Sequence, residues 1–409
     1  MEADDPTEAD LVVVNTCAFI EAAREESIDA VLTLADAKAE GARLVVTGCM
    51  AERYGAELAV AMPEVDLIAG FGTSLTATSP TRVSLGTKPD TRAEPTLLDL
   101  PRTQPAGPWA YVKVAEGCDR RCGFCAIPSF RGDQRSRSGP AVLAEVEQLV
   151  ASGTKEIVLI AQDLASWGLD RRAAGEGEAL EVLDLGRAAP MQPLVELVEQ
   201  VAAVAERVRL LYLYPSGLTP RLIEAIVATG VPYFDLSLQH ASPAHLRRMK
   251  RWGSAERFLE RIAAIRSLAP EATFRSSFIL GYPGETEADH DALLEFLDAA
   301  QLDWAGFFPF SAEVGTAAAV IEPQIPAELA LERLREASER QDEITFTRRE
   351  ALVGQTREVL IDTPGVARSI GEAPDIDGII EVPESLRVGT LVPVRIAESL
   401  GTDLIGEPV

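Results

Sequence analysis

The first part of the chain alternates short apolar runs with longer stretches in which apolar residues recur at helical spacing. The runs LVVVN at 11–15 and RLVVTG at 43–48 predict strands. Helices are predicted from about Phe19 to Leu34 and from about Ala51 to Ala61. Strands and helices that alternate in this way are typical of an open parallel α/β domain, which we place at residues 1–75.

A second and larger α/β pattern follows a segment without periodicity. Residues 76–107 are rich in Thr, Ser, Pro and Gly, and they predict a linker. Strand-like runs then recur between helical patterns, at 109–115, 156–161, 209–214, 233–238, 273–280 and 304–310. Six such units predict a partial (β/α)6 barrel over residues 108–350, which ends in a charged helix at about 327–349. The stretch at about 166–189 is glycine-rich and is expected to be an irregular excursion.

The pattern changes again after Gly354. Short β-like runs, REVLID, GIIEV, TLVPVRI and DLIGEPV, are separated by Gly and Pro turns. They predict a small antiparallel β-barrel over residues 351–409. The fold class is therefore α/β, with a third domain that is all β.

Composition and charge narrow the class of protein. Hydrophobic residues make up 47% of the 409 residues and charged residues 25%, as in globular proteins. No apolar run approaches the length of a membrane span, and the acidic start MEADDPTEAD is unlike a secretory signal, so a cytoplasmic location is expected. The net charge of −26 disfavours tight binding to a polyanion and favours a basic partner.

The cysteines are the first candidates for chemistry. In a reducing compartment, five cysteines are candidates for metal ligands or catalysis before disulfides. Cys118, Cys122 and Cys125 have the spacing C-x₃-C-x₂-C directly after the first barrel strand. Three thiolates can bind three irons of a four-iron, four-sulfur cluster and leave the fourth iron open. A zinc site with a distant fourth ligand, or cysteines without a ligand, are the alternatives.

Two further cysteines follow the two predicted strands of the first domain. Cys17 and Cys49 each come after one of these strands. Because sites form beyond the carboxyl ends of parallel strands, the two thiols are expected to be neighbours. The alternative is that both are small buried hydrophobic residues.

Other candidate residues lie in loops. Gly281 and Gly284 permit a tight turn, and Thr286 with Asp289 predicts a capping box at the start of a helix. His240 follows the fourth barrel strand and is either a site residue or a structural histidine. Several arginines surround the cysteine motif and are expected either to bind a carboxylate or to be solvated: Arg120, Arg121, Arg131, Arg135 and Arg137.

The cysteine motif, read as C-x₃-C-x-aromatic-C with Phe124 as the aromatic residue, resembles the signature of the radical S-adenosylmethionine (SAM) superfamily. In that superfamily the open iron binds SAM, and reduction of the cluster cleaves SAM to methionine and a 5′-deoxyadenosyl radical that removes a hydrogen atom from the substrate. The resemblance implies that the triad binds the cluster. The residues that it implies at the SAM site are Phe124, Gln162, Gln239 and Gly281.

Longer stretches resemble the methylthiotransferase family. Among them are NTCAFIEAAREESIDAV, GCDRRCGFCAIPSFRGDQRSR, VPYFDLSLQH, FILGYPGETEADHDALLEFL and GEAPDIDG. They are most similar to the RimO branch, which methylthiolates the β-carbon of an aspartate in ribosomal protein S-twelve of the small subunit. The MiaB branch, which modifies tRNA, differs in its counterparts of EESIDA and EAPDIDG.

The resemblance implies a second [4Fe-4S] cluster in the first domain. Cys17 and Cys49 match the second and third of its three cysteine ligands, and the first has no counterpart. Either the true start lies upstream or a ligand has been lost, and we favour the first because the segment from Asp10 onward fits without a gap. The resemblance also implies an electron donor such as flavodoxin, and no catalytic residue beyond the cluster ligands.

The last domain bears on the substrate. It resembles the TRAM domain, which binds RNA in relatives. A TRAM domain that binds RNA is expected to carry a basic face. From Gly354 to Val409 it contains four arginines, no lysine and ten acidic residues. This charge favours a basic ribosomal protein over nucleic acid as the substrate. A MiaB-like tRNA methylthiotransferase and a non-catalytic iron–sulfur protein that binds ribosomes are the alternatives.

Overall fold

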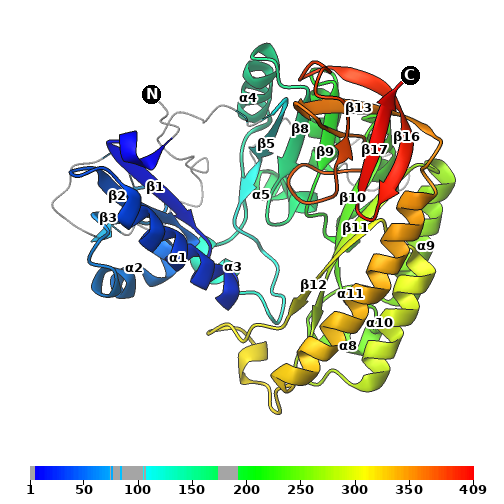
Figure 1. Cartoon of the computed structure of the whole chain (residues 1–409). Helices are drawn as coiled ribbons and strands as arrows, with labels where there is room; N and C mark the ends of the chain where they lie inside the picture. Colours follow the sequence, from blue (N-terminus) through cyan, green and yellow to red (C-terminus); the bar gives the residue numbers. More distant parts are fainter. Residues whose placement is uncertain (1–4, 74, 77–82, 85–104, 106, 174–191) are drawn as a thin grey trace. The chain divides into compact units, whose positions relative to one another are not determined.

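A computed structural model describes residues 5–73, 75–76, 83–84, 105, 107–173 and 192–409 (Figure 1). Its chain forms two units. The first joins Met1–Gln104, Gly117–Arg135 and Ser311–Ala319, and the second joins Pro105–Glu116, Ser136–Phe310 and Val320–Val409. The loop that carries the cysteine triad therefore belongs to the same unit as the N-terminal strands.

The first unit is built on a parallel sheet in the order β1-β2-β3-β4. Its apolar runs form the strands because residues of β2 are buried on both faces of the sheet. Val31 of α1 and Met50 of α2 are fully buried in its core. The elements are β1 (Leu11–Thr16), α1 (Glu21–Ala37), β2 (Arg43–Gly48), α2 (Cys49–Ala61), β3 (Leu67–Ala69) and β4 (Val83–Ser84).

A buried carboxylate and a backbone hydrogen bond tie the three segments of the first unit together. Glu313, whose side chain is 3% exposed, accepts hydrogen bonds from Arg24 of α1 and Arg53 of α2 at 2.8 Å. Burial alone would raise the pKa of Glu313, but the hydrogen bonds from Arg24, Ser311 and Arg53 lower it. The N–H of Ala318 donates to the carbonyl of Gly123 at 2.9 Å, within the cysteine loop. Segments far apart in the sequence are thus joined at charged and backbone contacts.

Six parallel strands form the sheet of the second unit. Two three-stranded sheets, β5-β8-β9 and β10-β11-β12, are joined where Leu213 bridges to Leu236. The predicted partial barrel of six strands is confirmed, with β5 and β12 at its edges. The strands are β5 (Trp109–Lys113), β8 (Glu156–Ile160), β9 (Arg207–Leu210), β10 (Tyr233–Gln239), β11 (Thr273–Leu280) and β12 (Trp304–Pro309).

Helices pack on this sheet and bury a large apolar core. Figure 1 shows α9, α10 and α11 side by side next to β11 and β12. The capping box predicted for α10 is confirmed, since the Thr286 hydroxyl accepts from the N–H of Asp289 and the Asp289 carboxylate accepts from the N–H of Thr286. The helices are α4 (Gly139–Ala151), α6 (Pro193–Ala202), α7 (Pro220–Ala228), α8 (Pro243–Arg248), α9 (Ala255–Leu268), α10 (Glu287–Ala300) and α11 (Ala327–Glu350).

The last domain is a closed barrel in the order β13-β14-β15-β17-β16. The small antiparallel barrel is confirmed, although β15 and β17 pair in parallel. Its core includes Val359, Ile380, Val394 and Leu404, all fully buried. The strands are β13 (Thr356–Thr363), β14 (Val366–Arg368), β15 (Ile380–Glu381), β16 (Leu391–Leu400) and β17 (Asp403–Pro408).

Buried ion pairs join this barrel to the six-stranded sheet. Glu156 of β8 is fully buried and lies 2.6 Å from Arg209 and 3.0 Å from Arg368 of β14. Arg368 also binds Asp362 of β13 through two hydrogen bonds. Burial would raise the pKa of Glu156, but Arg209 and Arg368 outweigh it and lower the pKa to about 2. The carboxylate therefore stays charged inside the protein.

Some expected boundaries were wrong. The strand expected at 209–214 is β9 at 207–210, because Tyr212 has a φ of 63° and leaves the ladder. The short strands β3, β4 and β14 were not predicted, since two or three residues show no periodicity. The expected excursion begins with a helix, α5 (Leu169–Ala173), and its remainder from 174 lies outside the described residues. Most of the expected linker at 76–107 also lies outside them.

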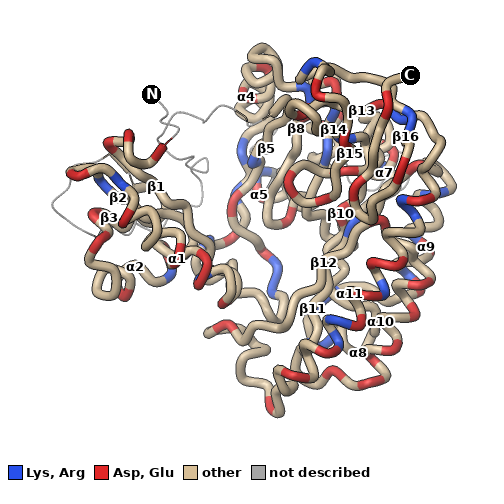
Figure 2. The backbone as a smooth tube through the Cα atoms, in the orientation of Figure 1, with Lys and Arg blue, Asp and Glu red and all other residues tan. Residues whose placement is uncertain are grey.

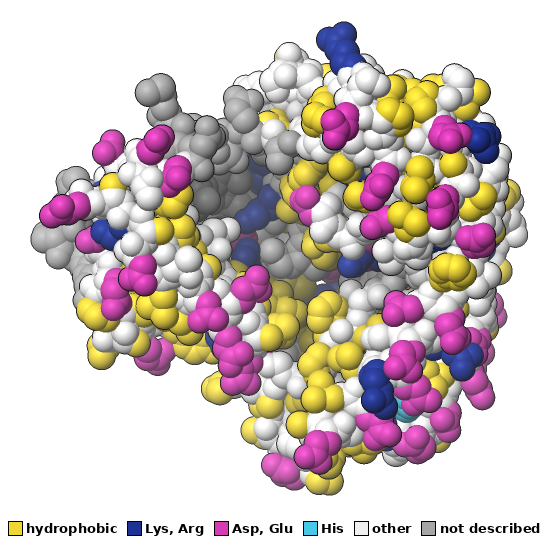
Figure 3. Space-filling view, viewed as in Figure 1, with side chains coloured by type: hydrophobic (Ala, Val, Ile, Leu, Met, Phe, Trp, Pro, Cys, Tyr) yellow, Lys and Arg dark blue, Asp and Glu magenta, His cyan; other side chains and the backbone are white. Residues whose placement is uncertain are grey.

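Acidic residues are spread over the elements of both units, as Figure 2 shows along the backbone. On the face seen in Figure 3, acidic side chains are scattered over much of the surface. This distribution fits the net charge of −26. Within the described part of the chain, we find no helix with the length and apolar character needed to cross a membrane.

Candidate functional site

The cysteine triad lies in a loop that closes on itself. The loop Gly117–Arg135 runs between β6 (Ala115–Glu116) and β7 (Arg135–Ser136) and includes α3 (Ile127–Arg131). The N–H of Cys118 donates to the carbonyl of Gly132 at 3.1 Å, and the Asp119 carboxylate accepts from the N–H of Gln134 at 2.9 Å. These bonds hold the ends of the cysteine segment together.

Gly117 is required for this closure. Its φ is +79°, and a Cβ placed on it would lie 2.2 Å from the carbonyl oxygen of Asp133. A residue with a side chain would force the two arms of the loop apart.

The donor set of the loop fits an iron–sulfur cluster. None of the five cysteines, all of which the structure describes, forms a disulfide. The N–H of Arg120 points to the sulfur of Cys118 at 3.4 Å, and the N–H of Cys125 donates to the carbonyl of Cys122 at 3.2 Å. Backbone N–H groups near a thiolate stabilise the negative charge that a cluster places there.

A compact zinc site is a poorer fit for the triad. Tetrahedral zinc with Zn–S bonds of about 2.3 Å requires sulfur atoms roughly 3.8 Å apart. Among the described residues, the three sulfurs of the triad do not form a group within 4.8 Å of one another, whereas His240, His245 and Glu285 do. The sulfurs of the triad, as they lie, are therefore too far apart for a tetrahedral zinc site.

Cys17 and Cys49 lie at the same edge of the N-terminal sheet. Thr16 of β1 pairs with Gly48 of β2, and each cysteine is the next residue. Cys49 is 8% exposed, and the N–H of Phe19 donates to the sulfur of Cys17 at 3.5 Å. Gly48 has a φ of +93°, and a Cβ there would lie 2.4 Å from the side-chain oxygen of Asn15, so only glycine leads into α2 here.

The arginines around the triad have separate partners. Arg131 donates to the sulfur of Cys49 at 2.7 Å. Arg121 pairs with Asp133 at 3.3 Å on the surface, and Arg137 is buried against Glu145 at 2.6 Å. Three of the five arginines around the triad therefore have different partners.

Residues expected near SAM follow barrel strands. Gln162 follows β8, Gln239 ends β10 with a φ of 72°, and Gly281 follows β11 with a φ of 75°. The N–H of Gly281 donates to Glu285 at 2.5 Å, which tightens the turn before α10. Since β10 and β11 are neighbours, Gln239 and Gly281 lie at adjacent strand ends, whereas Gln162 is two strands away. Phe124 is half-buried in the cysteine loop of the other unit.

A buried histidine cluster was not predicted from the sequence. His240 and His245 are fully buried, with ring centroids 4.4 Å apart, and burial lowers the pKa of both. The Nδ1 atom of His240 accepts from the N–H of Ser242. Glu285 lies nearby, but its oxygens already accept from Gly281 and Arg333. The cluster therefore fits a neutral structural core better than a cation site.

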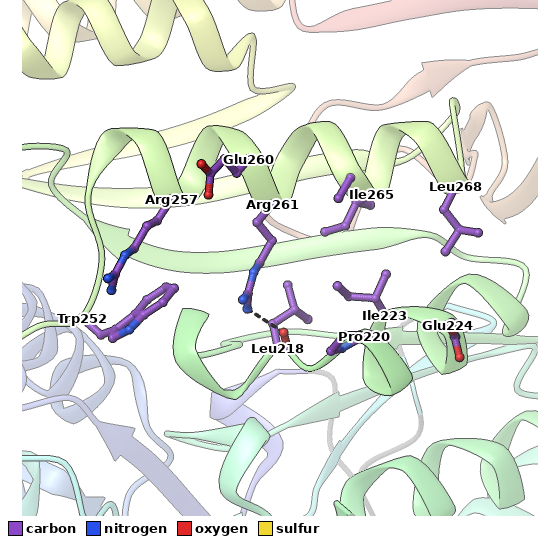
Figure 4. Close-up of a pocket in the computed structure, with 11 residues that line it drawn as sticks. Leu218, Pro220, Ile223, Glu224, Trp252, Arg257, Glu260, Arg261, Ile265 and Leu268 are labelled. Atoms are coloured by element: carbon purple, nitrogen blue, oxygen red, sulfur yellow. Dashed lines mark hydrogen bonds between the residues drawn. The ribbon is translucent and has the colours of Figure 1, made fainter. Parts of the chain in front are cut away.

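A surface groove of about 530 Å³ lies between α7 and α9 (Figure 4). Arg257 and Arg261 lie 5.6 and 5.5 Å from the ring of Trp252. Arg261 also donates to the carbonyls of Pro215 and Leu218. The residues that line this groove include Glu224 and Glu260 but no cysteine, so the groove offers no thiolate ligand to an iron–sulfur cluster.

Three family models match separate parts of the chain. The radical SAM superfamily matches residues 112–297, an uncharacterized protein family, UPF0004, matches residues 1–70, and the TRAM domain matches residues 353–409. The structure is also similar to the radical S-adenosylmethionine methyltransferase TsrM from Kitasatospora setae, with 15% identity, a TM-score of 0.46, and coverage of 73% of this chain and 61% of that chain.

Relatives match almost the whole chain. The ribosomal protein uS12 methylthiotransferase RimO of Kineococcus radiotolerans is 40% identical, and the match covers 99% of this chain and 91% of the relative. The protein of the same name from Moorella thermoacetica is 41% identical over 98% of this chain and 91% of the relative. The chain therefore belongs to the RimO family of radical SAM methylthiotransferases.

Proposed function

We propose that this chain is an enzyme that transfers a methylthio group to the β-carbon of an aspartate in ribosomal protein uS12, with SAM and an iron–sulfur cluster as cofactors. The observation that carries the proposal is the near full-length likeness to proteins named for this reaction, at 38–41% identity. The proposal requires Cys118, Cys122 and Cys125 to bind the cluster in the closed loop described above. The bound cluster supplies the electron that cleaves SAM.

The residues of the chain would position the cofactors and exclude water. The loop closure at Gly117 and Gly132 holds the triad, and the N–H of Arg120 offsets the charge on the sulfur of Cys118. Gln162, Gln239 and Gly281 at the strand ends are the residues that we assign to SAM, together with Phe124 of the loop. Radical chemistry needs such a pre-arranged site because an exposed radical is quenched by side reactions.

We assign Cys17 and Cys49 as two ligands of a second [4Fe-4S] cluster, which would be the source of the inserted sulfur. Their position at adjacent strand ends supports this assignment. Iron and sulfide analysis of the anaerobically reconstituted protein tests it, because each cluster holds about four irons. A content near one cluster per chain would favour a non-catalytic iron–sulfur protein or a single-cluster enzyme, and a content near two supports the proposal.

The substrate is proposed to be protein and not tRNA. Arg368 of the last domain is buried in ion pairs, so it is not available to a phosphate, and the exposed Arg395 is paired with Glu407. An acidic domain with few available cations suits a basic ribosomal protein. A reductant such as flavodoxin would supply electrons, and a ribosomal substrate implies a cytoplasmic location.

A deletion strain separates the two substrates. Mass spectrometry of uS12 and of bulk tRNA from the strain and its parent is expected to show that only the methylthio group of uS12 is lost. Restoration by the wild-type gene, but not by a Cys122→Ala variant, is the control. Loss of a tRNA modification with uS12 unchanged would instead identify the MiaB-like activity.

A further inference from the structure

A side chain from the loop of the first proposed cluster contacts a proposed ligand of the second. Arg131 is the last residue of α3 and follows Cys125 by six positions. Its Nη2 atom donates to the sulfur of Cys49 at 2.7 Å. All of these residues belong to the first unit, so the contact lies within one compact part of the chain.

The guanidinium of Arg131 has a second contact beside the sulfur of Cys49. It lies over the ring of Phe71, with 5.1 Å between Cζ and the ring centroid. The N–H of Phe71 donates to Glu52 of α2 at 2.8 Å, three residues after Cys49. Arg131 is therefore fixed against the first turn of the helix that Cys49 begins, and its contact with the sulfur is built into the packing.

The neighbouring residue of α3 strengthens this placement. Phe130 packs against the apolar core of the first unit, and the guanidinium of Arg53 lies 5.7 Å from its ring centroid. Arg53 is anchored in turn by Glu313 and by the carbonyl of Ala18, the residue after Cys17. Arg131 therefore contacts Cys49 itself, and Arg53 contacts the residue that follows Cys17.

We infer that Arg131 is a positioning residue that tunes the second cluster through a charged hydrogen bond to the sulfur of Cys49. This inference rests on the proposed role of Cys49 as a ligand. A hydrogen bond from a cation to a ligating sulfur stabilises the more negative, reduced state of a cluster, so it raises the reduction potential. It also places the two cluster loops in direct contact through one side chain.

The test measures the second cluster alone. In a full-length chain carrying Cys118→Ala, Cys122→Ala and Cys125→Ala, only the second cluster can bind. Iron content, the electron paramagnetic resonance spectrum and the midpoint potential are then compared for Arg131→Gln, Arg131→Lys and Arg121→Gln. Arg121 is the matched control, because it lies in the same loop but pairs with Asp133 on the surface, where both side chains are 65% exposed.

Arg131→Gln is expected to shift the midpoint potential to a more negative value and to alter the spectrum. Arg131→Lys should restore part of the shift, since it keeps a charged donor, and Arg121→Gln should match the parent. Loss of iron from Arg131→Gln alone, with unchanged circular dichroism, would also support the inference. An unchanged potential and spectrum in Arg131→Gln would overturn it, and so would equal unfolding in both Arg131 variants, which would assign a purely structural role.

Failure of the proposed function gives a different result. If the parent with the three substitutions binds no iron under reconstitution, this chain does not assemble the second cluster, and that assignment fails before Arg131 is considered. If the parent binds a cluster whose midpoint potential and spectrum are unchanged in Arg131→Gln, only the inference fails.

Discussion

Individual side chains in the barrel core set part of the pH dependence of stability. Burial lowers the pKa of His245 from its ordinary value of 6.5 to about 4, because the charged ring would lose its hydration. Below pH 6.5 the unfolded chain binds a proton that the folded chain does not. Stability due to this group is therefore fully present above pH 6.5 and falls by about 1.4 kcal/mol per pH unit as the pH drops toward 4.

His245→Gln is expected to remove this loss. Between pH 7 and pH 5, the wild-type free energy of unfolding should fall about 2 kcal/mol more than that of the variant, measured by urea denaturation at both values. Burial raises the pKa of Asp377 to about 6, so this group makes the free energy of unfolding rise as the pH falls. Its contribution is the same in the wild type and in His245→Gln. Equal losses in the two proteins would show that His245 is not a buried neutral side chain.

Residue chemistry could be predicted from the sequence only where it is local. The spacing of Cys118, Cys122 and Cys125 is visible because the three cysteines lie within one loop. His240, His245 and Glu285 form a cluster that no local pattern indicates, since Glu285 comes from a different turn. The contact of Arg131 with Cys49 was hidden for the same reason.

At the scale of elements, the cysteine loop depends on glycine at one end more than at the other. Gly117 and Gly132 have φ values of +79° and +76°, but only at Gly117 would a Cβ meet backbone, at 2.2 Å. Gly117→Ala is expected to cost about 1 kcal/mol for the backbone conformation and about 1–3 kcal/mol for the clash, and so to lower the iron bound by the triad. Gly132→Ala should cost about 1 kcal/mol and keep the iron.

Iron content after reconstitution, with Cys17 and Cys49 replaced by alanine in all samples, measures this difference. Equal iron in the two glycine variants would contradict the role of the loop closure.

Most elements could be predicted because their patterns are local. The six barrel strands and the capping box of Thr286 and Asp289 follow from apolar runs and from cap chemistry. The end of β9 could not be predicted, because the Asp235 carboxylate accepts the N–H of Tyr212 and holds that residue outside the ladder. Such a partner from another strand leaves no signal near residue 212.

At the scale of the whole chain, the second unit depends on charges buried between its two parts. Arg368 lies among Glu156, Asp362 and the carbonyl of Glu372, and its side chain is 3% exposed. Arg368→Met would leave two buried carboxylates with fewer partners, which costs about 3–5 kcal/mol. The pH dependence of the free energy of unfolding should change as well, since the low pKa of Glu156 depends on this arginine.

The control is Arg395→Met, which removes a pair with Glu407 in which both side chains are more than half exposed. It should cost less than about 1 kcal/mol. The midpoint of urea denaturation at pH 7 is the measurement. Similar shifts for the two variants would mean that the buried network contributes no more than a surface pair.

The order of the N-terminal parallel sheet, the six-stranded partial barrel and the C-terminal β-barrel could be predicted from the sequence, because each has its own periodicity and turn composition. The buried network could not, since its members are separated by up to 212 positions in the chain. Nor does any pattern show that Ser311–Ala319 joins the N-terminal unit through Glu313.

The most direct test of the proposed reaction uses the purified protein. After anaerobic reconstitution, it is incubated with SAM, a reductant and small ribosomal subunits from the deletion strain, and uS12 is analysed by mass spectrometry. We predict one methylthio group on a single aspartate of uS12, and none with the Cys118→Ala variant. Cleavage of SAM with uS12 unmodified, by protein that carries its full iron content, would contradict the account.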